Sequence, residues 1–286
     1  MYPVIFTLWD WVPVLGGEDI TSFGVFMLFA FLTGCYVIRA GMRDIGEDPD
    51  KAWDLVFMGV VGGIVGAKLY YILLNYERLA SDPGGLIISR GGLVWYGGFL
   101  LATALTVWEI KRQKLPLPKM ADVIAPALAL AYAVGRMGCF LVGDDWGRPT
   151  DSWVGIAFPR GTPATRVDVI ENLGISVDPA LVEKYGQIVP VHPTQLYEVA
   201  LSTLIFLFLW KIKGTRPAGW LFMLWLSLAG FERFLVEFLR AKDDRFFGVL
   251  TLAQLISLAI VATGIVGMTR INRGGRGGSR GMSTGC

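Results

Sequence analysis

Long apolar stretches, separated by short polar connections, dominate the pattern of residues along this chain. The stretches 20–38 and 246–269 contain no charged residue and are long enough to cross about 30 Å of hydrocarbon as helices. The stretch 91–110 is nearly as clear, and four others contain a charge within the apolar run: 53–75, 121–142, 194–211 and 217–239. The pattern therefore predicts an all-α, polytopic integral membrane protein with about seven transmembrane helices.

Composition supports this fold class and excludes others. Of the 286 residues, 53% are hydrophobic and 17% are charged, whereas soluble domains carry about 25% charged residues. The three cysteines are too few and too scattered for a disulfide framework or a zinc site, and the single histidine removes most histidine metal sites. The net charge of +2 gives no case for nucleic acid as a partner. We expect the lipid bilayer as a partner, and neither a metal nor an organic cofactor.

Two segments lie outside the apolar stretches. The connection 143–193 is rich in Gly, Pro and Asp, and connections of this length are often functional. We expect it to form a small cap on a single membrane domain that comprises residues 1–271. The tail 272–286 is a low-complexity segment of Gly, Ser and Arg, for which we expect disorder.

The distribution of Lys and Arg predicts how the chain is oriented. With seven spans, and with the connection 143–193 left aside, one side of the membrane collects fourteen of these residues and the other side five. Because cytoplasmic loops carry the excess of basic residues, this asymmetry predicts an N-terminus outside and a C-terminus in the cytoplasm. The cap would then lie on the outer, periplasmic side.

The second apolar stretch contains glycines at helical spacing. Gly59, Gly62, Gly63 and Gly66 form two overlapping pairs of small residues four positions apart. Such pairs allow the backbones of two membrane helices to approach closely. The spacing therefore predicts that this helix packs tightly against a neighbour.

A few ionisable side chains lie within the apolar stretches, where charges are costly and often functional. Arg233, Glu237 and Arg240 share one helical face, so Glu237 can contact both arginines. Arg136 lies in another span at a similar predicted depth. Guanidinium groups fit phosphate oxygens, so two arginines on different helices could hold a lipid phosphate. A neutralised structural ion-pair cluster is the alternative.

The residues around Arg136 allow other interpretations. Asp144 and Asp145 are adjacent, as in some metal sites, but such a pair is more common in turns and helix caps. Cys139 follows Arg136 by one helical turn and could be a reactive thiol or a small packing residue. We expect a turn and a packing residue here, and no metal.

Four segments resemble the motifs of one enzyme family. GRMGCFLVGDDWGRP (135–149), VHPTQLYE (191–198), FERFLVEFLR (231–240) and GGLVWYGGFL (91–100) are similar to segments of bacterial prolipoprotein diacylglyceryl transferases. The resemblance covers about residues 20–270. It implies an inner-membrane enzyme that moves the diacylglyceryl group of phosphatidylglycerol to the lipobox cysteine of a prolipoprotein signal peptide. The reaction forms a thioether and releases glycerol phosphate.

The resemblance also implies roles for individual residues. Arg136 and Arg233 would hold the phosphate and neutralise the charge that develops on it. The other residues implied in substrate binding are Cys139, Asp144, Gly147, Glu237 and Arg240. The further catalytic candidates are Tyr96 and His192. Arg148, Gln195, Tyr197 and Glu198 complete the matching motifs.

The chain departs from the family pattern at four positions. Tyr96 replaces a histidine that is a proposed base, Cys139 replaces an asparagine, and Phe23 and Ala229 replace tyrosines. A tyrosine with a pKa of about 10 is a poor base at neutral pH. Three explanations are open: the base is not essential, another group such as His192 serves, or the activity is altered. A lone histidine beside a proline is, however, more often a structural hydrogen-bonding residue than a base.

Two other functions follow from these departures and from the arginine pair. The chain could be a catalytically silent relative that binds lipid or lipoprotein. It could also be a permease that uses the arginines for an anion or a lipid. We see no inverted repeat with broken helices, which favours the transferase over the permease.

Overall fold

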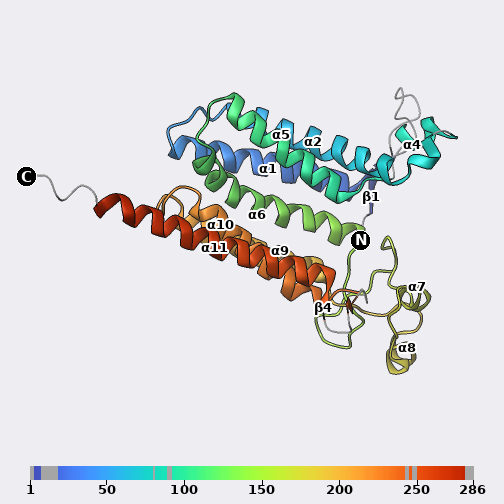
Figure 1. The fold of residues 1–286 in the computed structure, drawn as a ribbon. Coiled ribbons are helices and arrows are strands. Elements are labelled where there is room, and N and C mark those ends of the chain that lie inside the picture. Colours follow the sequence, from blue (N-terminus) through green and yellow to red (C-terminus); the bar gives the residue numbers. More distant parts are fainter. Residues whose placement is uncertain are drawn as a thin grey trace, which may run out of the picture. The chain divides into compact units, whose positions relative to one another are not determined.

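Helices make up most of the computed structural model (Figure 1). The chain divides into two compact units. One comprises Met1–Thr33 and Ala125–Cys286, and the other comprises Gly34–Ile124. The described residues are 3–7, 19–79, 81–88, 92–241, 245–246 and 250–280.

Five of the described helices are long and apolar enough to cross a membrane. They are α1 (Ser22–Asp44), α2 (Lys51–Leu74), α6 (Leu117–Val142), α9 (Thr194–Ile212) and the Leu252–Arg273 part of α11 (Leu252–Arg280). Two more long helices, α5 (Trp95–Arg112) and α10 (Trp220–Glu237), coincide with the remaining apolar stretches. The all-α, polytopic fold class is confirmed, while the count of seven spans stays a prediction.

The unit Gly34–Ile124 is built around the packing of α2 on α5, with the short helices α3 (Tyr76–Leu79) and α4 (Pro83–Ile88) between them in the chain. A Cβ atom added at Gly62 would lie 2.6 Å from the Cα of Ala102, too close for any side chain. Gly66 is in equally close contact with the backbone of Gly97. The tight packing predicted from the glycine spacing is confirmed, and α5 is the neighbour.

The other unit contains a hairpin of two antiparallel strands, β1 (Val4–Thr7) and β2 (Asp19–Thr21), and the C-terminal helices. α10 packs against both α9 and α11. A Cβ added at Gly230 of α10 would lie 3.0 Å from the carbonyl oxygen of Ser257 in α11, so these two helices also approach closely.

The start of α11 differs from the sequence-based boundary. The apolar stretch begins at residue 246, but β3 (Arg245–Phe246) pairs antiparallel with β4 (Leu250–Thr251), and the helix begins at Leu252. Thr251 and Gln254 cap it reciprocally. The Thr251 N–H donates to Gln254 Oε1 (3.0 Å), and the Gln254 N–H donates to Thr251 Oγ1 (3.1 Å).

The end of α11 also extends beyond the predicted span. The helix continues to Arg280, into the segment 272–286 for which the composition predicts disorder. Extending a helix that has already formed is far easier than starting one, which accounts for the added turns in a Gly-rich sequence. The last residues of that segment, 281–286, lie outside the described residues.

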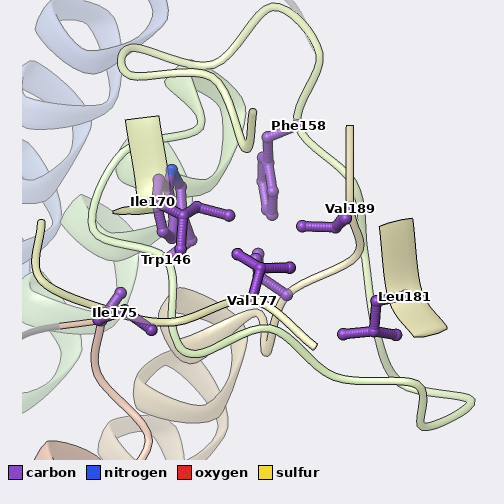
Figure 2. Packing of buried hydrophobic residues seen from close by; sticks show 9 residues of the cluster. Trp146, Phe158, Ile170, Ile175, Val177, Leu181 and Val189 are labelled. Carbon is purple, nitrogen blue, oxygen red and sulfur yellow. The ribbon is translucent and has the colours of Figure 1, made fainter. Parts of the chain in front are cut away.

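The connection 143–193, here called the cap, folds around an apolar core of its own (Figure 2). It contains two short helices, α7 (Val167–Asn172) and α8 (Pro179–Tyr185). The buried side chains of the core are Trp146, Phe158, Ile170, Ile175, Val177, Leu181, Val189 and Val191, together with Ala241 from beyond α10. The Trp146 indole N–H donates to the carbonyl of Pro163 (2.9 Å), so its one polar atom is satisfied.

Candidate functional site

The turn that follows α6 is held by the first residues of α9. The Thr194 hydroxyl donates to the carbonyl of Asp145 (2.6 Å), and the Gln195 amide donates to the carbonyl of Asp144. Thr194 and Gln195 are both completely buried. Asp145 has a positive φ of 55°, a left-handed conformation that Asp tolerates better than most residues. The TQ pair of the 191–198 motif therefore fixes the turn of the 135–149 motif.

Arg136 of α6 is buried and contacts both α9 and the turn that follows α6. Its Nε and Nη2 contact Glu198 Oε2, and its Nη1 donates to Asp145 Oδ2 (2.9 Å). The second oxygen of Glu198 accepts a hydrogen bond from the Tyr132 hydroxyl (2.9 Å). The Arg136 guanidinium is thus held by two carboxylates, one from α9 and one from the turn.

Arg233, Glu237 and Arg240 form the second half of the site, at the end of α10. Arg233 Nη2 lies 2.6 Å from Glu237 Oε2, and Arg240 Nε lies 3.7 Å from the same oxygen. Glu237 contacts both arginines, as their spacing predicts. Its other oxygen accepts a hydrogen bond from the Thr251 hydroxyl (3.1 Å), so the residue that precedes α11 also orients this carboxylate.

Asp145 connects the two halves. Its Oδ1 accepts from Arg240 Nη2 (2.8 Å), while its Oδ2 accepts from Arg136. The result is one ion-pair network of alternating charge, in the order Arg233, Glu237, Arg240, Asp145, Arg136, Glu198. From the sequence, Asp145 is expected only in a turn, and Glu198 is only a motif residue. An acidic group in a span opposite a buried arginine is the signal that could have identified Glu198.

One guanidinium nitrogen of this network has no partner among the described residues. Arg233 Nη1 is buried and donates a hydrogen bond to none of these residues, although the Arg233 side chain as a whole is 33% exposed. A buried N–H without an acceptor costs free energy, so this donor is available to an acceptor from outside the described residues, such as a bound anion. This is the position in the network best suited to bind an anion.

Cys139, Asp144 and Asp145 lie close together but do not suit a metal cation. Their ligand atoms are within 4.8 Å of one another. However, Arg136 Nη1 is 3.4 Å from Cys139 Sγ and already bonded to Asp145, so a positive charge occupies the middle of the cluster. Burial, and the neighbouring Asp145, raise the pKa of Asp144. Burial also opposes ionisation of Asp145, but Arg240 and Arg136 outweigh it and lower its pKa.

His192 supports the turn mainly through its backbone. The Gly147 N–H donates to the His192 carbonyl (2.8 Å), and the His192 N–H donates to the Arg148 carbonyl (3.0 Å). A Cβ at Gly147 would lie 2.9 Å from the His192 Cβ, which explains a glycine there. The imidazole Nδ1 is 3.1 Å from the Tyr197 hydroxyl, and burial lowers its pKa. His192 is therefore neutral at pH 7, with a structural hydrogen bond.

The positions that depart from the motifs lie in different places. Phe23 packs at the start of α1 against Gly138 of α6, where an added Cβ would lie 3.3 Å from the Phe23 Cα. Tyr96, the second residue of α5, is 53% exposed, and its ring contacts Trp95 edge-on. Tyr96 belongs to the unit Gly34–Ile124, whereas the ion-pair network belongs to the other unit. A catalytic role for Tyr96 stays a prediction.

Comparisons with known proteins agree on one family. A family model described as prolipoprotein diacylglyceryl transferase matches residues 12–270, which include all four motif segments. Proteins named phosphatidylglycerol–prolipoprotein diacylglyceryl transferase are similar over most of their length. The one from Vibrio atlanticus is 31% identical over 263 residues, covering 89% of this chain and 87% of that protein. The one from Geobacter sulfurreducens is 30% identical over 268 residues (91% and 94%), and the one from Burkholderia ambifaria 34% over 279 residues (88% and 90%).

Proposed function

Since this chain belongs to the prolipoprotein diacylglyceryl transferase family, we propose that it transfers the diacylglyceryl group of phosphatidylglycerol to the lipobox cysteine of prolipoproteins. The cysteine sulfur attacks the glyceryl carbon that carries the phosphate. The carbon–oxygen bond breaks, its electron pair leaves with glycerol phosphate, and a thioether forms. The thiol proton is released in the process.

The Arg233 N–H that has no acceptor among the described residues is the observation that carries the assignment of the phosphate site. Arg233 Nη1 donates to a phosphate oxygen of the lipid and stabilises the charge that develops as the carbon–oxygen bond breaks. Glu237 holds the other side of this guanidinium at 2.6 Å and so directs Nη1 toward the lipid. Arg136 and Arg240 add positive charge at the same network.

The guanidinium groups also favour the thiolate nucleophile. A thiol with a pKa of about 8.5 ionises more readily next to fixed positive charges. The released proton is taken up by the product phosphate, whose second pKa is about 6. On this account neither Tyr96 nor His192 has to act as the base, which fits the tyrosine at the position where the family pattern has histidine.

The membrane setting completes the proposal. The family consists of bacterial inner-membrane proteins, and the apolar helices fit a bilayer. The excess of Lys and Arg on one side supports an N-terminus outside and a C-terminus in the cytoplasm. The cap and the ion-pair network then lie toward the periplasm, where a lipobox peptide arrives.

The test is complementation of a bacterial strain depleted of its own transferase. Growth together with diacylated lipoprotein in the membrane, identified by mass, supports the transferase. Lipid or lipoprotein binding by the purified protein without any diacylated product would instead identify a silent relative. Movement of lipid or anion across vesicles without product would identify a permease.

A further inference from the structure

Asp145 stands out among the carboxylates of the ion-pair network. It contacts two arginines, one oxygen for each: Arg136 at 2.9 Å and Arg240 at 2.8 Å. A phosphodiester also presents two oxygens to guanidinium donors and also carries one negative charge. The Asp145 carboxylate therefore occupies a position that a lipid phosphate could take.

Exposure separates Asp145 from the other two carboxylates. The side chains of Glu198 and Glu237 are 1% and 2% exposed, whereas that of Asp145 is 42% exposed. A buried carboxylate cannot leave its arginine without a large desolvation cost, but a carboxylate that already faces solvent can. Asp145 is thus the only carboxylate of the network that can exchange with water at low cost.

The backbone at Asp145 is consistent with a side chain that changes partners. The turn is held through the main chain, because the Asp145 carbonyl accepts the hydrogen bond from Thr194 and the Asp144 carbonyl accepts one from Gln195. These contacts do not involve the Asp145 carboxylate. The carboxylate can therefore rotate away from the arginines while the turn stays in place.

We propose that Asp145 is an exchangeable counter-ion of the phosphate site, which yields its place between Arg136 and Arg240 to the phosphodiester of the incoming lipid. This inference rests on the proposed function and specifies how its substrate enters. The exchange conserves charge, since one monoanion replaces another beside the same guanidiniums. The N–H groups released by Asp145 then join Arg233 Nη1 around the phosphate.

Binding of short-chain phosphatidylglycerol to the purified, detergent-solubilised protein tests the exchange. Asp145→Asn removes the competing charge and keeps a residue that tolerates a positive φ. We expect the Kd for the lipid to fall about tenfold, equivalent to about 1.4 kcal/mol. Asp145→Gly, which removes the side chain and relaxes the backbone, should act in the same direction. Asp151→Asn is the matched control, because Asp151 is an exposed aspartate of the cap paired with Lys184, and its Kd should not change.

Equal or weaker binding by the two Asp145 variants, with an unfolding temperature like that of the wild type, would overturn the exchange. That result would mean that Asp145 positions the arginines while the lipid is bound, and kcat would then fall with little change in KM. Transfer to a lipobox peptide by the wild-type protein is measured separately. Its absence would refute the proposed function, whereas its presence with unchanged Kd values would refute only the exchange.

Discussion

The carboxylate of Glu198 and the guanidinium of Arg136 form a buried ion pair between α9 and α6. The two residues are 62 positions apart in the chain, and the pair joins the 135–149 and 191–198 motifs. Tyr132 and Asp145 add a hydrogen bond on each side. The position of Arg136 therefore depends on Glu198, which contacts no other arginine of the network.

Removing the charge of Glu198 should destabilise the fold strongly. Glu198→Gln leaves the buried Arg136 with only a half-exposed aspartate as its counter-ion, and breaking such pairs costs about 3–5 kcal/mol. The measurement is thermal unfolding in detergent. Glu232→Gln is the matched control, because this glutamate is also buried but is hydrogen-bonded to the Ser202 hydroxyl rather than to an arginine. Equal losses in the two variants would contradict a special role for the Arg136–Glu198 pair.

Thr251 should affect both the start of α11 and the orientation of Glu237. Thr251→Ala removes a helix cap worth about 1 kcal/mol and the hydrogen bond to Glu237 Oε1. We expect a lower unfolding temperature together with a loss of transfer rate. Thr251→Ser keeps the hydroxyl and should restore both properties. A serine variant as impaired as the alanine variant would show that the methyl group, and not the hydroxyl, is needed.

The single histidine makes one pH effect easy to isolate. Because burial lowers the pKa of His192 in the folded protein below its ordinary value of 6.5, the unfolded chain takes up a proton first as the pH falls. Stability is therefore unaffected by His192 above about pH 6.5 and decreases below it. We expect His192→Gln to lose less stability than the wild type between pH 7 and pH 5, measured by unfolding in detergent. Parallel curves for the two proteins would contradict the lowered pKa.

The same variant separates the two roles of His192. With a structural histidine that is hydrogen-bonded to Tyr197, the transfer rate at pH 7.5 should stay within about threefold of the wild type. A loss of a hundredfold or more, with unchanged affinity for phosphatidylglycerol, would instead assign the base to His192.

The long helices and part of the site could be predicted from the sequence. Apolar runs gave the positions of the helices because burial in lipid requires long uncharged segments, and the i, i+4 spacing of Arg233 and Glu237 gave their contact. The fold of the cap could not be predicted in this way, because its core side chains, such as Trp146, Phe158 and Val189, come from segments without a regular period. The start of α11 was placed too early because apolar residues continue through β3 and β4. The T-x-x-Q pattern at Thr251 is the sequence signal that marks the N-terminus of this helix.

The role of Asp145 also could not be read from the sequence. Its two arginines lie nine residues before it and ninety-five residues after it, so only the folded chain brings them to one carboxylate. Local spacing rules apply within one helix and do not report such contacts. Arg136 and Arg233 could be selected as a pair because they lie at a similar predicted depth. The carboxylates that connect them could not be predicted, because the connection runs through residues distant in the chain.

The most direct test of the account is the rate of diacylglyceryl transfer from phosphatidylglycerol to a lipobox peptide by the Arg233→Gln variant. Arg233 is partly exposed and its Nη1 is the proposed phosphate ligand, so the variant should fold and lose about a hundredfold in kcat/KM. Arg166→Gln, which removes an exposed arginine of the cap paired with Asp168, serves as the control and should retain the wild-type rate. A wild-type rate in Arg233→Gln would contradict the placement of the phosphate and, with it, the proposed mechanism.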